Sequence, residues 1–331
     1  MDNVSLYPLK FKPIFFDKIW GGQKINTKLG MDFSPMPNCG EVWVLSGYPD
    51  KESVVENGFL AGNGLNELIE VYMGDLIGES VFEKFGEEFP ILVKFIDAAD
   101  YLSIQVHPDD AYAAKRNIGR GKTEMWYVMD ADEGSELITG FNQPVHKNKY
   151  IEHLNSKTLR EILNVEKVNR GEVFYLPAGR VHAIGPGLLL AEIQETSDNT
   201  FRIYDWDRLD DKGNLRELHT EQALEVIDFS LAEKYKTSYL NKPNIPANLA
   251  TCEHFTVNYL HLTQGINLNY HIYDSFEVHL CLEGSGKMEY NGGNVPFKTG
   301  DCILIPNELE SVRIVPEKSV KILEVFLENQ K

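Results

Sequence analysis

Basic residues are scarce in this sequence. It contains 32 Lys and Arg residues against 50 Asp and Glu, which gives a net charge of −18 at pH 7. This balance argues against nucleic acid or an anionic membrane as a partner, because both carry negative charge themselves. It also sets a condition on any anionic substrate, which needs a local cluster of Lys and Arg to overcome the overall field.

Long apolar runs and paired cysteines are lacking as well. No stretch approaches the roughly 18 apolar residues of a membrane span, and residues 1–13 contain no apolar core of a signal peptide. The cysteines show no Cys-x-x-Cys spacing; they are Cys39, Cys252, Cys281 and Cys302. Scattered cysteines are typical of reduced thiols, so we expect a cytoplasmic protein.

The remaining composition suits a globular protein of two parts. The chain has 331 residues, of which 43% are hydrophobic, enough for two packed domains. A stretch rich in Asn and Pro, ending at residue 250, predicts a linker. Short alternating segments with Gly and Asn turns follow it, a pattern typical of a β-barrel or sandwich. We therefore expect domains over 1–240 and 251–331, joined by a linker over 241–250.

Periodicity predicts several elements of the first domain. Alternation of apolar and polar residues predicts strands over 40–46, 90–96, 102–108, 121–129 and 173–176. Apolar residues spaced three and four apart predict helices over 65–89, 109–118, 155–163 and 220–227. The first of these helices contains Gly74 and Gly78, near which we expect it to break.

The stretch from Gly171 to His182 carries the most informative motif of the sequence. It has a strand, then a turn built on Pro177 and Gly179, then a second strand that carries His182. This spacing of Gly, Pro, Gly and His is that of the second motif of cupin barrels, where the histidine points inward and binds a metal. A histidine after such a turn is about as often a packed core residue as a metal ligand. Whether His182 binds a metal therefore depends on whether the chain supplies other ligands.

Such ligands occur on two other predicted strands. Ser103, Gln105 and His107 share one strand face, because side chains alternate along a strand. Three polar groups there either face solvent or line a polar cavity. Lys122 and Glu124 likewise share a face. The set Gln105, His107, Glu124 and His182 suits Zn²⁺ with an open or water-filled position.

Five stretches resemble a known family and occur in its order. They are WGG (Trp20–Gly22), LSIQVHP (Leu102–Pro108), KTEMW (Lys122–Trp126), YLPAGRVHAI (Tyr175–Ile184) and ETSDNTFRIYDWDR (Glu195–Arg208). The sequence resembles the type I mannose-6-phosphate isomerases, in particular the short bacterial form. The resemblance runs through Asp207 and extends loosely to the C-terminus. It departs at Ile184, where fungal members carry a Tyr.

The resemblance implies a fold, a metal site and a reaction. The fold would be mainly β, with two cupin-type β-barrels, or jelly rolls, and a few added helices. The first domain would hold one Zn²⁺ per chain through Gln105, His107, Glu124 and His182. Arg202 matches the family's active-site arginine after Ser197-Asp198-Asn199. The implied reaction, in carbohydrate metabolism, interconverts mannose 6-phosphate and fructose 6-phosphate.

That reaction moves a proton between C1 and C2 of a phosphorylated hexose through a cis-enediol(ate). Zn²⁺ can polarise the carbonyl without redox chemistry. Arg202 is always charged and suits either the enediolate or the phosphate. Further phosphate candidates are Lys94, Ser103 and Lys122. The general base stays open between Glu192, Asp198, Lys122 and a zinc-bound water.

Other interpretations fit parts of the pattern. Two His and one carboxylate also suit Fe(II) in a non-haem oxygenase, and a cupin without catalysis can bind sugars. The amide ligand and the nearby basic residues favour the isomerase. Single residues have structural alternatives: Glu41 facing solvent, Glu192 in the barrel wall, and Arg202 paired with Asp198 across a turn. The sequence leaves both a monomer and a homodimer open.

The second domain repeats the first in weakened form. Gly300 to Pro306 repeats the spacing of Gly171 to Pro177, and in that register His182 corresponds to Ser311. Glu124 corresponds to Glu277. His271 lies close upstream, and we expect no second imidazole to complete a site. We therefore predict a degenerate cupin domain without metal, kept for packing or for shaping the pocket mouth.

Overall fold

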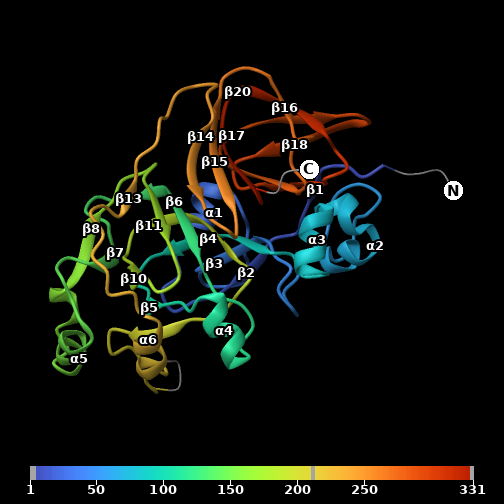
Figure 1. Ribbon diagram of the computed structural model, residues 1–331. Coiled ribbons are helices and arrows are strands. Elements are labelled where there is room, and N and C mark those ends of the chain that lie inside the picture. Colours follow the sequence, from blue (N-terminus) through green and yellow to red (C-terminus); the bar gives the residue numbers. More distant parts are fainter. Residues whose placement is uncertain (1–4, 210–212, 329–331) are drawn as a thin grey trace.

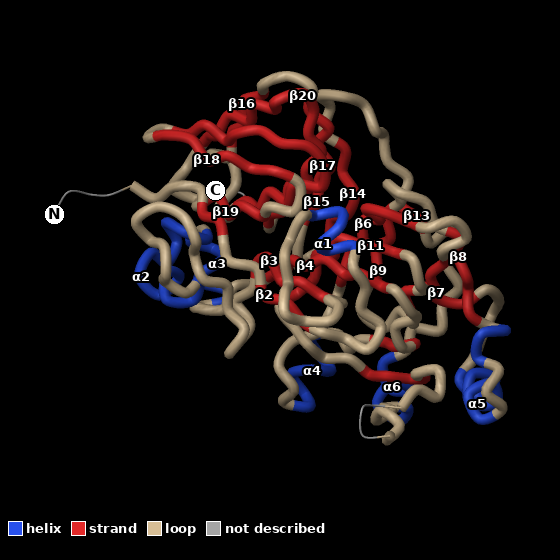
Figure 2. Tube along the Cα trace, turned by 180° about the vertical axis from the view of Figure 1, so that it is seen from behind, coloured by secondary structure: helices blue, strands red, loops and turns tan. Residues whose placement is uncertain are grey.

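The computed structural model describes residues 5–209 and 213–328, so residues 1–4 and 329–331 of the expected domains, and 210–212, lie outside the described residues. Figures 1 and 2 show two bodies built mostly of strands, with α4, α5 and α6 at the outer edge of the first. This confirms a mainly β fold with a few added helices. No helix among the described residues is long and apolar enough to cross a membrane. The cytoplasmic location stays a prediction.

Two antiparallel sheets form the first body. The larger has the order β13 (Lys236–Thr237), β9 (Val173–Leu176), β6 (Glu124–Ala131), β11 (Leu188–Glu195), β4 (Ile91–Ala98), β3 (Glu41–Leu45) and β2 (Ile14–Phe16). The smaller has the order β12 (Phe201–Tyr204), β5 (Ile104–Val106), β10 (His182–Ile184), β7 (Glu136–Phe141) and β8 (Leu163–Lys167). A core cluster joins them, with Trp126 and Phe174 from the larger sheet and Leu137 and Ile184 from the smaller. This is the sandwich expected of a cupin domain.

The central strands of the larger sheet place three polar residues in one row. β4 and β11 are buried along their whole length, and their register sets Glu192 opposite Lys94. On the other side of β11, Trp126 of β6 lies opposite the same glutamate. Buried polar groups in apolar strands need partners, and this register supplies them.

The helices are short and lie outside the sheets. They are α1 (Lys24–Leu29), α2 (Leu65–Ile77), α3 (Glu79–Phe85), α4 (Asp110–Arg116), α5 (Lys147–Asn155) and α6 (Thr220–Val226), with a 3₁₀ turn at Leu159–Glu161. The expected break in the first long helix is confirmed, with a non-helical Met73 inside α2 and Gly78 between α2 and α3. The helix predicted over 155–163 is wrong. Its apolar residues belong to the 3₁₀ turn and to the start of β8, and the true helix ends at Asn155.

One sheet forms the second body. Its order is β1 (Leu9–Lys10), β19 (Cys302–Ile305), β17 (Glu277–Tyr290), β20 (Ser311–Phe326), β15 (Thr256–Leu262) and β14 (Ala247–Thr251). β16 (Ile266–Asn269) pairs with β20, and β18 (Gly293–Lys298) pairs with β17. The N-terminal strand β1 therefore belongs to the C-terminal sheet, and β14 includes the last residues of the predicted linker. The domain boundaries themselves stay a prediction.

The two bodies share a hydrophobic core. Phe89 packs against Phe276 with ring centroids 4.6 Å apart, and Tyr127 stacks on Tyr259 at 5.9 Å. All four side chains are buried. Aromatic pairs of this kind contribute about 0.5–1.5 kcal/mol beyond the area that they bury. The second domain thus packs firmly against the first, as expected.

Candidate metal centre and active site

Two histidines of the first domain reach the same place from neighbouring strands. His182 opens β10 and lies opposite Gln105 of β5 in the register between them. The turn before it has Gly179 at φ 86°, where a Cβ would lie 2.9 Å from the carbonyl oxygen of Val226, so glycine suits this position. The amide of Gly179 donates to the carbonyl oxygen of His107 at 2.9 Å. This bond ties the two histidine segments together.

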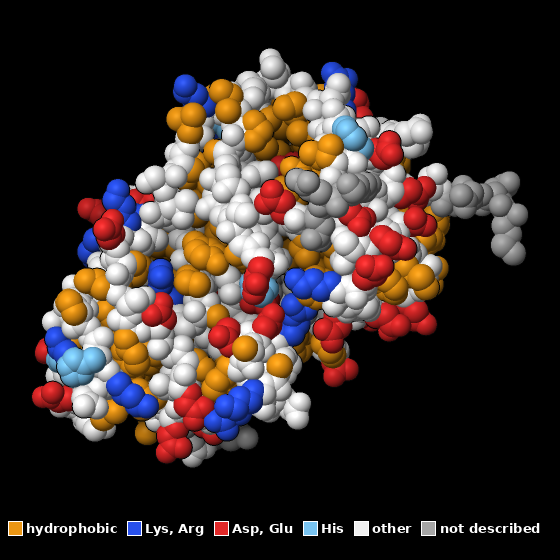
Figure 3. All heavy atoms as spheres, viewed as in Figure 1, with side chains coloured by type: hydrophobic (Ala, Val, Ile, Leu, Met, Phe, Trp, Pro, Cys, Tyr) orange, Lys and Arg blue, Asp and Glu red, His pale blue; other side chains and the backbone are white. Residues whose placement is uncertain are grey.

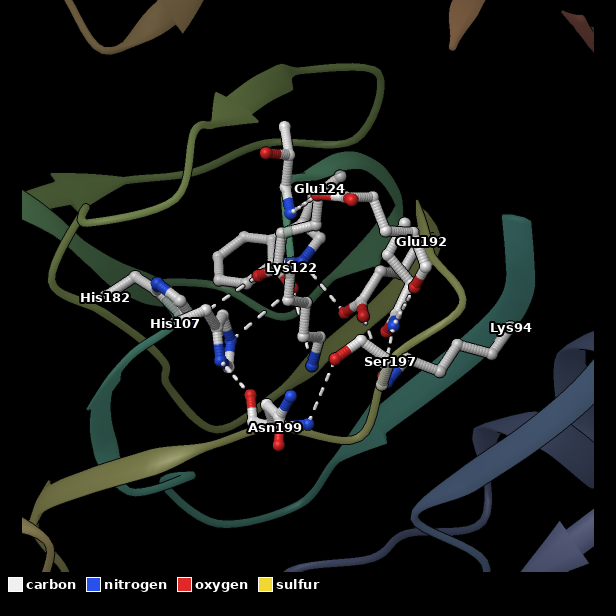
Figure 4. A network of polar contacts seen from close by, with 12 residues as sticks. Lys94, His107, Lys122, Glu124, His182, Glu192, Ser197 and Asn199 are labelled. Carbon is white, nitrogen blue, oxygen red and sulfur yellow. Dashed lines mark hydrogen bonds and ion pairs between the residues drawn. The ribbon is translucent and has the colours of Figure 1, made fainter. Parts of the chain in front are cut away.

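The two imidazoles converge on one carboxylate, as Figure 4 shows. His182 Nε2 lies 3.3 Å from Glu124 Oε1, and His107 Nε2 lies 3.6 Å from Glu124 Oε2. All three side chains are at most 2% exposed. Neither Nε2 atom and neither oxygen has a hydrogen-bond partner in the described structure. Four buried, unpartnered atoms facing one point are costly unless a ligand joins them.

Hydrogen bonds on the far side of each ring fix how the histidines face the site. His107 Nδ1 lies 2.7 Å from the carbonyl oxygen of Asn199, and His182 Nδ1 lies 2.8 Å from that of Arg180. A carbonyl oxygen only accepts, so each Nδ1 carries the hydrogen and each Nε2 presents its lone pair. Metal-binding histidines are oriented in this way by their outer partners.

The protonation behaviour of the three residues also fits a cation. Burial lowers the pKa of His182 to about 3, so its imidazole is neutral. Burial first, and then the charge of Glu192, raises the pKa of Glu124 to about 8. A bound cation inverts this preference, because it stabilises the carboxylate and leaves the imidazoles neutral. His107, Glu124 and His182 therefore form a metal-binding triad, with ligand atoms within 4.8 Å of one another.

A cavity of about 300 Å³ opens beside the triad. Most of the predicted site residues line it: Lys94, Ser103, Gln105, Lys122, Glu124, Glu192, Asp198 and Arg202. His107 and His182 adjoin it through Glu124. All of the lining residues lie between Lys18 and Arg216, so no described residue of the second domain lines the cavity, and the predicted alternative that this domain shapes the pocket mouth finds no support there.

Lys94 lies between two carboxylates. Its Nζ is 3.0 Å from Glu192 Oε1 and 3.6 Å from Glu41 Oε2. Trp126 Nε1 donates to the other oxygen of Glu192 at 2.9 Å. Burial alone lowers the pKa of Lys94, but the charges of Glu192 and then Glu41 outweigh it and raise that pKa. The positive charge of Lys94 is thus already balanced within the protein.

Arg202 faces a second arginine instead of Asp198. Its backbone amide donates to His219 Nδ1 at 3.2 Å, and its Nη1 donates to the carbonyl oxygen of Glu217 at 2.8 Å, while Nε has no hydrogen-bond partner in the described structure. Burial, and then the positive charge of Arg216, lower the pKa of Arg202. Asp198 lies 3.4 Å from Lys51, so the predicted alternative of an Arg202–Asp198 pair does not describe this site.

Nine lining residues were not among the predicted site residues, and Lys18, Glu41, Trp126 and Arg216 are among them. Lys18 and Arg216 lay in none of the quoted motifs, Trp126 ended the KTEMW stretch without a role of its own, and Glu41 was weighed as a solvent-facing residue. Glu41 instead lines the cavity with Lys18 Nζ at 3.1 Å, and burial of its carboxylate is outweighed by Lys94 and Lys18, which lower its pKa. Arg216 is held by Asp205 at 3.3 Å. Asp205 also accepts from Arg208 at 2.6 Å, so it holds two arginines on the segment that follows Arg202.

The equivalent place in the second domain has a different character. Glu277 is 1% exposed and neither of its oxygens has a partner among the described residues. Burial, and then Glu324, raise its pKa well above the usual value, so it is a neutral acid. Besides His271, which the sequence singled out, the imidazole of His279 is buried two residues after Glu277. The Nε2 atom of His279 lies 2.8 Å from the Tyr270 hydroxyl, so this nitrogen is already hydrogen-bonded.

The fold and this site together define a two-domain cupin protein with a buried metal-binding triad. The model of the phosphomannose isomerase type I catalytic domain matches residues 9–144, and that of the mannose-6-phosphate isomerase cupin domain matches residues 246–321. The chain is 36% identical over 317 residues to the mannose-6-phosphate isomerase ManA of Bacillus subtilis, covering 94% of this chain and 96% of ManA. It belongs to the type I mannose-6-phosphate isomerase family.

Two further comparisons agree with this assignment. A mannose-6-phosphate isomerase of Streptococcus mutans is 34% identical over 305 residues, which cover 92% of this chain and 94% of that protein. The crystal structure of the mannose 6-phosphate isomerase from Bacillus subtilis superposes with a TM-score of 0.86 at 32% identity. That match covers 96% of this chain and 99% of the crystallised one. Membership of this family favours an isomerase over the alternatives of an oxygenase or a non-catalytic cupin.

Proposed function

We propose that this protein is a zinc-dependent aldose–ketose isomerase that interconverts mannose 6-phosphate and fructose 6-phosphate through a cis-enediol(ate). The observation that carries the proposal is the buried triad His107–Glu124–His182, which opens onto a cavity lined by cationic side chains. Such a cavity supplies the local positive field that an anionic substrate needs in a protein of net charge −18. Figure 3 shows many of the acidic side chains on the side of the molecule where α2 and α3 lie.

Zinc is the metal that this ligand set suits best. Two imidazole nitrogens and one carboxylate, with a position left open, are the donors of many catalytic zinc sites. Gln105 lies on the cavity wall next to His182 in the strand register and is the fourth candidate ligand. When bound, the ion supplies Lewis acidity that polarises the sugar carbonyl. We propose one Zn²⁺ per chain.

The phosphate is best placed at the arginine side of the cavity. Arg202 and Arg216 both line it, and each lies in the positive field of the other. An anion between two guanidinium groups relieves their repulsion, and their planar donors match phosphate oxygens. Ser103 and Lys122 also line the cavity and are further phosphate ligands. Lys94 is balanced by two carboxylates, so we assign it to holding Glu192.

Glu192 is the residue that we propose as the general base. It is 2% exposed and lines the cavity next to the triad, and Trp126 and Lys94 fix both of its oxygens in place. A positioned carboxylate can move a proton between adjacent carbons of a bound sugar. Asp198 is 52% exposed at its side chain, which makes it less suited to a proton transfer shielded from water. Lys122 stays a catalytic candidate because its Nζ lies 3.6 Å from Glu124 Oε2, beside the metal-binding triad.

The direct test is to incubate the purified protein with fructose 6-phosphate and to assay for mannose 6-phosphate. We expect conversion to an equilibrium mixture, loss of activity after chelation, and recovery when Zn²⁺ is added back. The variant Glu192→Gln should bind metal normally and lose most of kcat, whereas Asp198→Asn should keep most of it. Absence of any isomerisation by the zinc-loaded protein would refute the proposal.

A further inference from the structure

Residues 121–124 bring two side chains of the proposed active site, Lys122 and Glu124, into the cavity. β6 begins only at Glu124, so the backbone amides just before it are not held by the ladder between strands. Each buried amide needs an acceptor from elsewhere. The amide of Lys122 donates to the carbonyl oxygen of Pro108 at 2.9 Å.

Side-chain carboxylates accept from the amides on either side. Asp110 Oδ1 accepts from the amide of Gly121 at 2.8 Å, and Glu195 Oε1 accepts from that of Thr123 at 2.7 Å. The backbone amide of Glu195 also donates to the carbonyl oxygen of Thr123 at 3.2 Å. Each carboxylate thus holds the segment with one oxygen, and its second oxygen faces another group.

That other group is a histidine of the second domain. His254 lies in the turn between β14 and β15, and its side chain is 12% exposed. Its Nδ1 lies 3.1 Å from Glu195 Oε2 and 3.9 Å from Asp110 Oδ2. The guanidinium of Arg120 lies 4.0 Å from the same two oxygens. Groups from both domains therefore meet at the two carboxylates that hold the segment.

We propose that Glu195, assisted by Asp110 and His254, is a positioning residue for the segment from Lys122 to Glu124, and that the second domain thereby helps to hold the active site in shape. The inference rests on the proposed function of that site. Burial, and then the charge of Asp110, raise the pKa of Glu195 to about 7, so its carboxylate needs nearby partners. Groups behind a metal ligand orient it, and their loss typically costs about 10–100-fold in metal affinity or activity.

The same three residues also have the composition of a small metal site. Arg120 argues against that use, because a guanidinium 4.0 Å from both carboxylates already supplies positive charge and repels a dication. A second metal is therefore kept as one outcome of the test.

The experiment compares four variants, each loaded with Zn²⁺. It measures kcat, KM, thermal unfolding and zinc affinity by competition with a chelator. Glu195→Ala should lower zinc affinity and kcat by about 10–100-fold, with a smaller change in KM. Glu195→Gln should stay close to wild type, because the amide oxygen still accepts from Thr123. His254→Ala should lower zinc affinity and kcat several-fold. Its control His261→Ala, on β15 of the same domain, should leave both unchanged.

Wild-type zinc affinity and kcat in Glu195→Ala would overturn the inference, and so would equal behaviour of His254→Ala and His261→Ala. Two zinc ions per chain, with one lost in His254→Ala, would make the cluster a metal site instead. If Glu195→Ala does not fold, the two histidine variants still decide. If the wild-type protein proves inactive, the proposed function fails, while zinc affinity in the same variants still tests the positioning role.

Discussion

Replacing Lys94 with methionine separates two possible roles of this buried cation of the cavity. If Lys94 holds Glu192 and Glu41, the variant Lys94→Met leaves two carboxylates close together without their shared counter-ion. The folded protein should then lose stability before any substrate is present. If Lys94 binds the phosphate instead, the loss should appear mainly in KM.

The expected size of the loss follows from the distances. Lys94 Nζ lies 3.0 Å from Glu192 and 3.6 Å from Glu41, and at an effective dielectric constant of about 20 each attraction is roughly 5 kcal/mol before desolvation. Removing one partner of a buried pair typically costs about 3–5 kcal/mol. We expect about 3 kcal/mol, because the cavity admits water and Glu41 keeps Lys18 at 3.1 Å.

Chemical denaturation of the zinc-loaded, substrate-free protein measures this loss, and steady-state kinetics measure KM. The control is Lys51→Met, which removes a cation 3.4 Å from Asp198 where both side chains are at least 36% exposed; there we expect less than about 1 kcal/mol. Adding Glu192→Gln to Lys94→Met should restore part of the lost stability. Unchanged stability together with a raised KM would refute the assignment and make Lys94 a phosphate ligand.

Three further predictions concern the metal and the arginine. His182→Ala should remove zinc and isomerase activity together, because it takes one imidazole from a triad; a metal-free preparation with full activity would contradict this. Arg202→Ala should lower kcat by about 10²–10³ if the side chain stabilises the enediolate, or raise KM if it only binds phosphate, with zinc content unchanged; near-normal kinetics would leave it a structural role. Glu277→Ala should leave zinc content, at one per chain, and kcat intact, whereas two tightly bound ions per chain, one of them lost in Glu277→Ala, would show that the second domain has been misjudged.

Local sequence patterns predicted those parts of the structure that depend on local geometry. The turn before His182 and the break in the helix over 65–89 follow from Gly and Pro, whose backbone preferences act within a few residues. The helix expected over 155–163 failed because apolar spacing alone does not separate a short helix from a turn followed by a strand. Lys18 and Arg216 were missed because only the tertiary fold brings them to the cavity.

The pairing of β1 with β19 has a consequence for how the chain folds. Leu9 lies opposite Leu304, and the amide of Leu6 donates to Glu308 at 3.1 Å. A chain made from its N-terminus thus produces its first strand long before that strand's partner exists, and contacts so distant in sequence form slowly. A protein ending at residue 240 would contain every residue proposed to bind metal or substrate, and would still lack His254, leave β1 unpaired and leave the shared core uncovered. The first domain therefore holds the residues proposed to bind metal and substrate, but it depends on the second domain to complete its fold.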